Sequence, residues 1–218
     1  MKLVLIDGLP GTGKSTLARS LCEVLREGGL ETAWYLEEAG DHPVHPASLI
    51  QTRNELTFAD RCLESWHHFV QHVGSSDGLH VLEGSAFQST VRFLMEQEHP
   101  NTDVYFRRFV EIIQPLSPAL IYLCTDNALE HSHNVAAHRG ADWSYKVSTY
   151  LQETPYSMAR NWKGEPGMHL FWSNYAGRCS ELVRRSELAT LTLMTVPGDA
   201  RSQLSKSIAF LRGMDVRI

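Results

Sequence analysis

The segment IDGLPGTGKSTLA, residues 6–18, decides the fold of this chain of 218 residues. Its glycines and lysine follow the spacing G-x-x-x-x-G-K-S/T, from Gly8 through Gly13 and Lys14 to Ser15. The apolar run LVLI just before it is typical of a buried strand, and a helical pattern follows it. A strand, a glycine-rich turn and a helix form the context in which this spacing binds phosphate groups.

Each residue type in this segment suits a nucleoside triphosphate. Backbone N–H groups of the turn 8–13 can point at a polyphosphate, because glycine tolerates the required dihedral angles and has no obstructing side chain. The next helix adds the positive end of its dipole. Lys14 is expected to neutralise the β- and γ-phosphates, and Ser15 to offer its hydroxyl to Mg²⁺. The residues predicted to hold ATP and Mg²⁺ are Gly8, Pro10, Gly11, Thr12, Gly13, Lys14, Ser15 and Thr16.

Composition narrows the class of protein. Apolar residues make up 43% of the chain, which is enough to fill the core of a single domain over residues 1–218. The formal charge of −5 argues against a nucleic-acid partner, which usually requires a basic excess. No apolar run is long enough to span a membrane, and the four cysteines lie too far apart in sequence to suggest a zinc site. We expect a cytoplasmic protein without a membrane partner, and homodimer formation is left open.

Short apolar runs alternate with longer helical patterns along the whole chain. This alternation predicts an α/β fold with a parallel sheet that carries helices on both faces. Strands are expected near residues 2–7, 31–37, 79–83, 119–124 and 190–195. Helices are expected over 14–27, 48–73, 86–97, 102–114, 127–137, 143–161, 168–186 and 199–212. In the second helix, Leu56, Leu63 and Phe69 are expected to face the core. The region 130–168, rich in His, Trp and Tyr, is expected to form a lid.

Carboxylates follow three of the expected strands. Ligands of open α/β sheets bind beyond the carboxyl ends of the strands, which draws attention to Asp7, Glu37, Glu38 and Glu83. Glu83 is expected to serve Mg²⁺ or to accept a proton, and a bracing role on the phosphate loop stays open for it, as for Asp7. Because successive side chains of a strand alternate, we predict that Glu37 alone faces the cleft and Glu38 points away.

Several side chains near these carboxylates are candidates for binding the second substrate. They combine cations, amides and rings of the kind that recognise a small polar molecule. The predicted substrate-binding residues are His42, Arg53, Arg61, Phe87, Gln88 and Arg92.

Five segments together resemble the thymidylate-kinase and deoxynucleoside-kinase group of P-loop kinases. They are IDGLPGTGKST (6–16), LEEAGDHPVHP (36–46), LHVLEGSAFQS (79–89), PALIYLCTDN (118–127) and AHRGADW (137–143). The resemblance implies a five-stranded parallel sheet ordered 2-3-1-4-5 and a mobile helical lid arm. It also implies a catalytic carboxylate after the second strand, which is Glu37 here, and a lid arginine, which is Arg139.

Two departures from that group broaden the expected activity. Glu83 is followed by Gly84 and Ser85, where members of the group often have an arginine, and the arm lacks the usual set of lid arginines. The resemblance therefore supports a small-molecule kinase more generally.

The expected activity is transfer of the γ-phosphoryl group of ATP, with Mg²⁺, to a small-molecule acceptor. A nucleoside or nucleotide is the leading acceptor, and an antibiotic or a polyol is an alternative. A regulatory ATP-binding NTPase without an acceptor is a third interpretation. The predicted catalytic residues are Lys14, Glu37, Glu83 and Arg139, with Ser15 and Glu83 as metal ligands.

Overall fold

A parallel sheet forms the centre of the molecule. The computed structural model describes residues 1–196, 198–214 and 216. Within them, the strands pair in the order β2–β3–β1–β4–β5, and all the pairings are parallel. The strands are β1 (Leu3–Gly8), β2 (Thr32–Tyr35), β3 (Leu79–Glu83), β4 (Ala119–Cys124) and β5 (Ala189–Met194). The predicted α/β class and the strand order 2-3-1-4-5 are confirmed.

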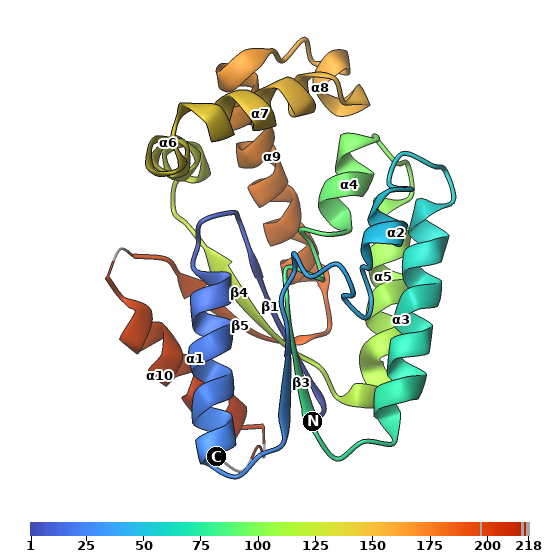
Figure 1. Ribbon diagram of the computed structural model, residues 1–218, viewed down its shortest axis with the longest axis vertical. Coiled ribbons are helices and arrows are strands. Elements are labelled where there is room, and N and C mark those ends of the chain that lie inside the picture. The colour runs from blue at the N-terminus through green and yellow to red at the C-terminus, as the bar shows by residue number, and fades with distance from the viewer. Residues whose placement is uncertain (197, 215, 217–218) are drawn as a thin grey trace.

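Helices lie on both faces of the sheet and above its carboxyl-terminal edge (Figure 1). They are α1 (Lys14–Glu27), α2 (Ala47–Ile50), α3 (Phe58–Gly74), α4 (Val91–Glu96), α5 (Thr102–Ile113), the 3-10 turn η1 (Gln114–Leu116), α6 (Ala128–Arg139), α7 (Ala141–Gln152), α8 (Pro155–Ala159), α9 (Gly164–Arg185) and α10 (Ala200–Arg212). Among the described residues, no helix is both long and apolar enough to cross a membrane.

The strands feed two separate apolar clusters because their side chains alternate between the faces of the sheet. Val4 and Ile6 belong to the cluster that α1 and α10 cover. Leu3 and Leu5 belong to the larger cluster that α3, α5 and α9 cover. Burial of β1 on both faces explains why its sequence is a continuous apolar run.

The helix predicted over 48–73 is wrong as a single element. The chain forms α2, then a series of turns over 51–57, and only then α3. The Thr52 hydroxyl donates to the Leu49 carbonyl at 2.8 Å, and this local bond competes with continuation of the helix. Leu56 lies in the turns and is 89% exposed, whereas Leu63 and Phe69 are buried as predicted.

Two further predicted helices are shorter than expected. Of the segment 86–97, only α4 is helical, because residues 84–90 form a compact turn whose backbone bonds to Asp7 and to itself. The segment 143–161 divides into α7 and α8. Thr154 caps α8, accepting a bond from the Ser157 N–H at 3.4 Å, and Pro155 occupies the first turn.

The expected lid region, 130–168, packs against the rest of the molecule in this structure. Ala136 of α6, Leu151 of α7 and Met168 of α9 belong to the larger apolar cluster. Helices α6 and α7 lie above the carboxyl ends of the strands, next to α9 (Figure 1). A closing motion of this region stays a prediction.

Aromatic packing between α3 and α5 offers a test of the core. The Phe109 ring is fully buried, and its centroid lies 4.8 Å from that of Trp66. Replacing Phe109 by Ala should lower the free energy of unfolding by about 3–5 kcal/mol, because the cavity cannot fully collapse.

Val104 on the same helix is 41% exposed, so Val104→Ala should change stability by less than about 0.5 kcal/mol. Urea denaturation of both variants would measure the difference. Similar losses for the two variants would contradict this packing.

Candidate functional site

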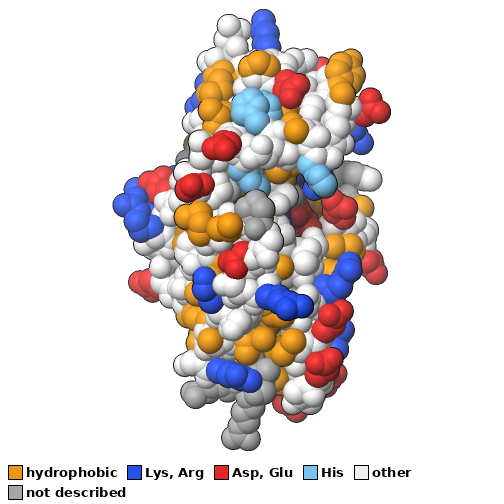
Figure 2. Space-filling view, turned by 90° about the vertical axis from the view of Figure 1, so that its left-hand side faces the viewer, with side chains coloured by type: hydrophobic (Ala, Val, Ile, Leu, Met, Phe, Trp, Pro, Cys, Tyr) orange, Lys and Arg blue, Asp and Glu red, His pale blue; other side chains and the backbone are white. Residues whose placement is uncertain are grey.

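A cleft of about 980 Å³ opens above the carboxyl ends of the strands. Its floor is formed by residues of the segment 10–16. Residues 36–38 together with Glu83 and Gln88 form one wall, and the polar face of α6 forms the opposite wall. Figure 2 shows acidic and histidine side chains gathered near a hollow between the upper helices and the body of the molecule. The cleft therefore lies where an open α/β sheet binds its ligands.

The phosphate loop, residues 8–15, forms the turn that its sequence predicts. Pro10, Gly11, Gly13, Lys14, Ser15 and Thr16 line the cleft. Gly13 is the N-cap of α1 and has a φ of +93°. Gly13 and the first residues of α1 line the cleft, and the N-terminus of a helix suits an anion.

Two predicted nucleotide-binding residues lie beneath the loop and not in the cleft. A Cβ on Gly8 would lie 2.3 Å from the Leu123 carbonyl oxygen, so glycine here allows β1 and β4 to approach each other. Thr12 is 2% exposed, and its hydroxyl donates to the Leu9 carbonyl at 2.8 Å. Gly8 shapes the loop from below, whereas Thr12 also lines a smaller groove beside the loop.

The ammonium group of Lys14 lies in the floor of the cleft. It donates to Gln88 Oε1 at 2.7 Å, to the Leu9 carbonyl at 3.2 Å and to the Gly8 carbonyl at 3.3 Å. All three partners are neutral oxygens, so the positive charge of Lys14 is not cancelled by an ion pair. An anion in the cleft can therefore approach this charge, which interacts at longer range with the carboxylates of Asp7, Glu37 and Glu83.

Asp7 joins the phosphate loop to the turn after β3. Its Oδ1 accepts from the Gly8 N–H and its Oδ2 accepts from the Phe87 N–H, both at 2.8 Å. Complete burial raises the pKa of Asp7 to about 6, although the Lys14 charge and these N–H groups oppose the rise. This geometry fits the bracing role that the sequence left open for Asp7.

Glu83 and Ser15 meet on the floor of the cleft. The Ser15 hydroxyl donates to Glu83 Oε1 at 2.9 Å, and the Glu37 N–H and the Trp34 indole also lie near this carboxylate, whose Oε2 is buried. Burial raises the pKa of Glu83, while the Ser15 hydroxyl and the Lys14 charge oppose the rise.

A hydroxyl and a carboxylate are ligands that Mg²⁺ accepts. The described residues contain no group of three or more His, Cys, Asp or Glu side chains that could hold a metal ion. The fit is therefore to a cation that takes its other ligands from phosphate oxygens and water.

Glu37 is held in place from two sides. The Ser89 hydroxyl donates to its Oε1 at 3.2 Å. Its Oε2 packs so closely on Gly84 that a Cβ added to Gly84 would lie only 2.3 Å from this oxygen. Burial raises the pKa of Glu37 to about 7, and the nearby positive charge of Lys14 opposes the rise. The glycine after Glu83, which departs from the resembled group, therefore makes room for this carboxylate.

The prediction that Glu38 points away from the cleft is wrong. Strand β2 ends at Tyr35, so the alternation of a strand no longer applies at residues 37 and 38. Both carboxylates line the cleft in the turn that follows, with Glu38 the more exposed.

Of the predicted substrate-binding residues, Gln88 lines the cleft. Phe87 is fully buried and stacks on Phe106 with the ring centroids 5.2 Å apart, so the structure places it in the core. Arg61 pairs with Glu55 at 3.4 Å and does not line the cleft.

His42 is also buried rather than exposed to a ligand. Its ring stacks on His45 with the centroids 5.4 Å apart, and its Nδ1 accepts from the His45 N–H at 3.1 Å. Burial lowers the pKa of His42 to about 4. The pair holds the loop 41–46 against Ser85, since the His45 ring bonds to the Ser85 carbonyl at 3.0 Å.

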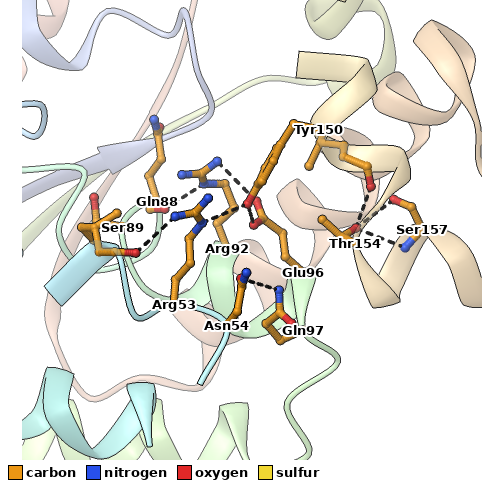
Figure 3. A network of polar contacts seen from close by, with 12 residues as sticks. Arg53, Asn54, Gln88, Ser89, Arg92, Glu96, Gln97, Tyr150, Thr154 and Ser157 are labelled. Carbon is orange, nitrogen blue, oxygen red and sulfur yellow. Dashed lines mark hydrogen bonds and ion pairs between the residues drawn. The ribbon is translucent and has the colours of Figure 1, made fainter. Parts of the chain in front are cut away.

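Arg53 and Arg92 lie together behind the wall that Gln88 forms. Arg92 pairs with the buried Glu96 at 3.3 Å, and Arg53 donates to the Tyr150 hydroxyl at 3.4 Å. Figure 3 shows both arginines directed toward Tyr150 and Glu96. The structure thus brings these two predicted residues together, but neither lines the cleft.

One wall of the cleft was not predicted from the sequence. Polar and small residues of α6 and its N-cap follow a helical stripe with spacings of three and four. They are Asn127, Glu130, His131, Asn134, Val135 and His138. His131 bonds to the Pro10 carbonyl at 2.9 Å, which links α6 to the phosphate loop. The spacing itself was a usable signal, because one face of a helix repeats at these intervals.

Arg139 ends α6 and lines the cleft. Its guanidinium lies 5.2 Å from the centroid of the Trp143 ring, and Gly140 follows with a φ of +89°. The side chain is exposed and brings a positive charge to the α6 wall of the cleft.

A second, smaller groove of about 190 Å³ adjoins the phosphate loop on its other side. It lies between the first turns of α1 and the segment that follows β5, with Gly11, Gly13, Thr16 and Thr195 common to both cavities. The sequence analysis did not include this groove, because residues far apart in the chain create it.

No family model and no curated protein matches the sequence. Among solved structures, the chain is similar to shikimate kinase from Acinetobacter baumannii in complex with shikimate. The TM-score is 0.54 at 15% identity, over 99% of this chain and 96% of that one. It is also similar to an unliganded sugar kinase from Janibacter sp. HTCC2649, with a TM-score of 0.53 at 15% identity over 97% and 95% of the chains.

A third similar structure is the YorR protein from Bacillus subtilis in complex with phosphorylated GDP. It has a TM-score of 0.52 at 12% identity over 98% of this chain and 97% of that one. At these identities the likeness shows the fold alone, the α/β fold that this chain shares with the three proteins. It does not single out the thymidylate-kinase group.

The contact between Gly84 and Glu37 can be tested by substitution. Gly84→Ala should lower the free energy of unfolding by about 1–3 kcal/mol, because the new Cβ would overlap the carboxylate and the φ of +64° is unfavourable for alanine. In a Glu37→Ala background the same substitution should cost less, since the overlap is gone.

Gly74→Ala is the matched control, because a Cβ there meets nothing within 4 Å. Thermal and urea denaturation would measure all four variants. If Gly84→Ala costs the same in both backgrounds, Glu37 is not packed against Gly84.

Proposed function

We propose that this chain is a small-molecule kinase that transfers the γ-phosphoryl group of ATP, with Mg²⁺, to a hydroxyl group of an acceptor. One observation carries the proposal: Lys14, the Ser15–Glu83 pair and Glu37 converge on one open cleft. Phosphoryl transfer depends mainly on positioning and charge neutralisation, and these groups supply both. The proteins of similar fold include a sugar kinase and a shikimate kinase, which supports the same class of reaction.

The two cavities suggest how the nucleotide would lie. The triphosphate would cross the phosphate loop, with its oxygens on the N–H groups at the start of α1 and on Lys14. The base would occupy the groove beyond Thr16, on the β5 side of the loop. The γ-phosphate would then lie toward Glu83 and Glu37, on the β2–β3 side.

Ser15 and Glu83 would hold Mg²⁺ through the hydroxyl and the carboxylate, which lie together on the floor of the cleft. When bound, the ion would neutralise negative charge on the phosphate oxygens. Glu83 lies at the end of a buried strand, so its carboxylate keeps a fixed position relative to the loop.

Glu37 would accept the proton of the attacking hydroxyl. Its pKa of about 7 lies near neutral pH, where a general base works best. Ser89 and Gly84 fix the carboxylate on the wall opposite Arg139. Arg139 would place its planar guanidinium on the transferring group from the α6 side.

A purely regulatory ATP-binding protein would not need space for an acceptor. The cleft extends past the phosphate loop to Leu36, Glu38 and Gln88, on the side away from the base groove. This additional space favours a kinase with a second substrate over a regulatory NTPase.

Lys14→Ala tests the phosphate site. Loss of the charge should lower acceptor-dependent ADP formation by about 10²-fold or more, because a single lost contact to developing charge has effects of this size. Lys146→Ala is the control, because Lys146 is exposed on α7 and does not line the cleft. A coupled assay of ADP release over a panel of acceptors, with mass detection of the product, would measure both. Normal turnover by Lys14→Ala would contradict the proposed function.

Glu37→Gln tests the general base. In the wild type, kcat/KM should rise with pH through about 7, where Glu37 loses its proton, and then level off. In Glu37→Gln, kcat should fall by about 10²–10⁴-fold and this rise should disappear. Glu38→Gln should keep the rise, whatever its effect on KM.

The pH dependence of the free energy of unfolding provides an independent measurement of the Glu37 pKa. The folded protein binds the Glu37 proton up to about pH 7, whereas the unfolded chain releases it near the ordinary value of 4.5. The contribution of Glu37 to the free energy of unfolding should therefore decrease as the pH rises between these values. Glu37→Gln should remove that decrease, and an unchanged pH dependence would show that Glu37 does not titrate there.

A further inference from the structure

The acceptor half of the cleft is defined by Leu36, Glu37, Glu38, Glu83 and Gln88. It lies over β2 and β3, on the opposite side of the phosphate loop from the groove after β5. If the base occupies that groove, the acceptor must approach from this half. Any inference about the charge of the acceptor from this half of the cleft therefore rests on the proposed function.

The acceptor half is acidic. Three of its five residues are glutamates, and the other two are an amide and an aliphatic side chain. The cation nearest to it in the floor, Lys14, belongs to the phosphate loop and would be engaged by the triphosphate. Among the described residues that line the cleft, the other full positive charge is Arg139, which stands on the opposite wall.

The two arginines behind this half make hydrogen bonds within the protein, Arg92 to a carboxylate and Arg53 to neutral oxygens. Arg92 donates from Nε to the Gln88 carbonyl at 3.0 Å and pairs through Nη1 with Glu96 at 3.3 Å. Arg53 donates to the Ile50 carbonyl at 3.3 Å and to the Tyr150 hydroxyl at 3.4 Å. Figure 3 shows these bonds joining Arg92 to Gln88 and Glu96, and Arg53 to Tyr150.

The buried carboxylate of Glu96 holds Arg92 in its position behind the cleft. Its side chain has no exposed surface, and it accepts a hydrogen bond from the Tyr150 hydroxyl in addition to the Arg92 pair. Moving Arg92 to an acceptor anion would leave the Glu96 charge buried without its ion-pair partner, which is unfavourable. The ring of Phe93 also packs 4.1 Å from the Arg92 guanidinium.

We infer that the acceptor is a hydroxyl compound without a phosphate or carboxylate group. An uncharged or positively charged molecule, such as a nucleoside, a polyol or an amino sugar, can place its hydroxyl beside Glu37. A nucleotide or a sugar acid would bring negative charge next to Glu37 and Glu38, and the described residues that define this half of the cleft include no lysine or arginine to receive it. Within the acceptor classes expected from the sequence, this favours the nucleoside or polyol over the nucleotide.

Matched acceptor series would test the inference on the wild-type protein. Each series keeps one scaffold and changes its charge: a nucleoside with its 5′-monophosphate, and a neutral sugar with its amino sugar and its uronic acid. The kcat/KM values for acceptor-dependent ADP formation should be about tenfold or more higher for the uncharged or amino member than for the acidic member.

Preference for the acidic member in the active series would overturn the inference while leaving the kinase assignment intact. If no member of a broad panel raises ADP formation above the rate without acceptor, the proposed function fails instead. The two failures are therefore distinguishable without any variant.

Glu96→Gln adds a test of the Arg92 ion pair. It removes the ion pair that holds Arg92, so discrimination against the acidic acceptor should weaken, with a lower KM for that member. Glu98→Gln is the matched control, because Glu98 pairs with Arg160 at 2.5 Å on the surface two residues away. Equal discrimination in wild type and a folded Glu96→Gln variant would show that Arg92 does not set the acceptor charge.

Discussion

The buried carboxylate of Asp7 ties together the two segments on which the site depends. One oxygen holds the N–H of Gly8, where the phosphate loop begins, and the other holds the N–H of Phe87, in the turn after β3. That turn also carries Gln88, which touches Lys14, and Ser89, which touches Glu37. Because Asp7 is completely buried, these bonds have no competition from water, and the loop and the turn keep a fixed relation.

The fold could be predicted from the sequence where the signal is local. The spacing of the phosphate loop specifies a strand, a turn and a helix, and the doubly buried strands appear as apolar runs. The break at residues 51–57 could not be predicted, because apolar residues such as Leu56 continue the helical pattern there while the chain turns. The short α4 has a similar cause, since the turn before it is held by a bond to Asp7, 80 residues earlier.

The site, like the fold, could be predicted from the sequence where neighbouring residues form it and not where tertiary contacts form it. The residues of the phosphate loop lie together because they are neighbours in sequence. Arg92 and Phe87 were predicted to bind the substrate, but their partners, Glu96 and Phe106, turn them away from the cleft. Only tertiary contacts decide such orientations. The α6 wall was recognisable from its spacing, yet its direction toward the loop depends on the bond between His131 and the Pro10 carbonyl.

The central claim is that the cleft delivers the γ-phosphoryl group to an acceptor and not to water. The most direct measurement is ³¹P NMR of ATP turnover with Mg²⁺ and an acceptor that raises ADP formation. The account predicts a phosphate-ester resonance that grows in step with ADP, with little inorganic phosphate. Inorganic phosphate formed at the rate of ADP, whether or not an acceptor is present, would contradict it.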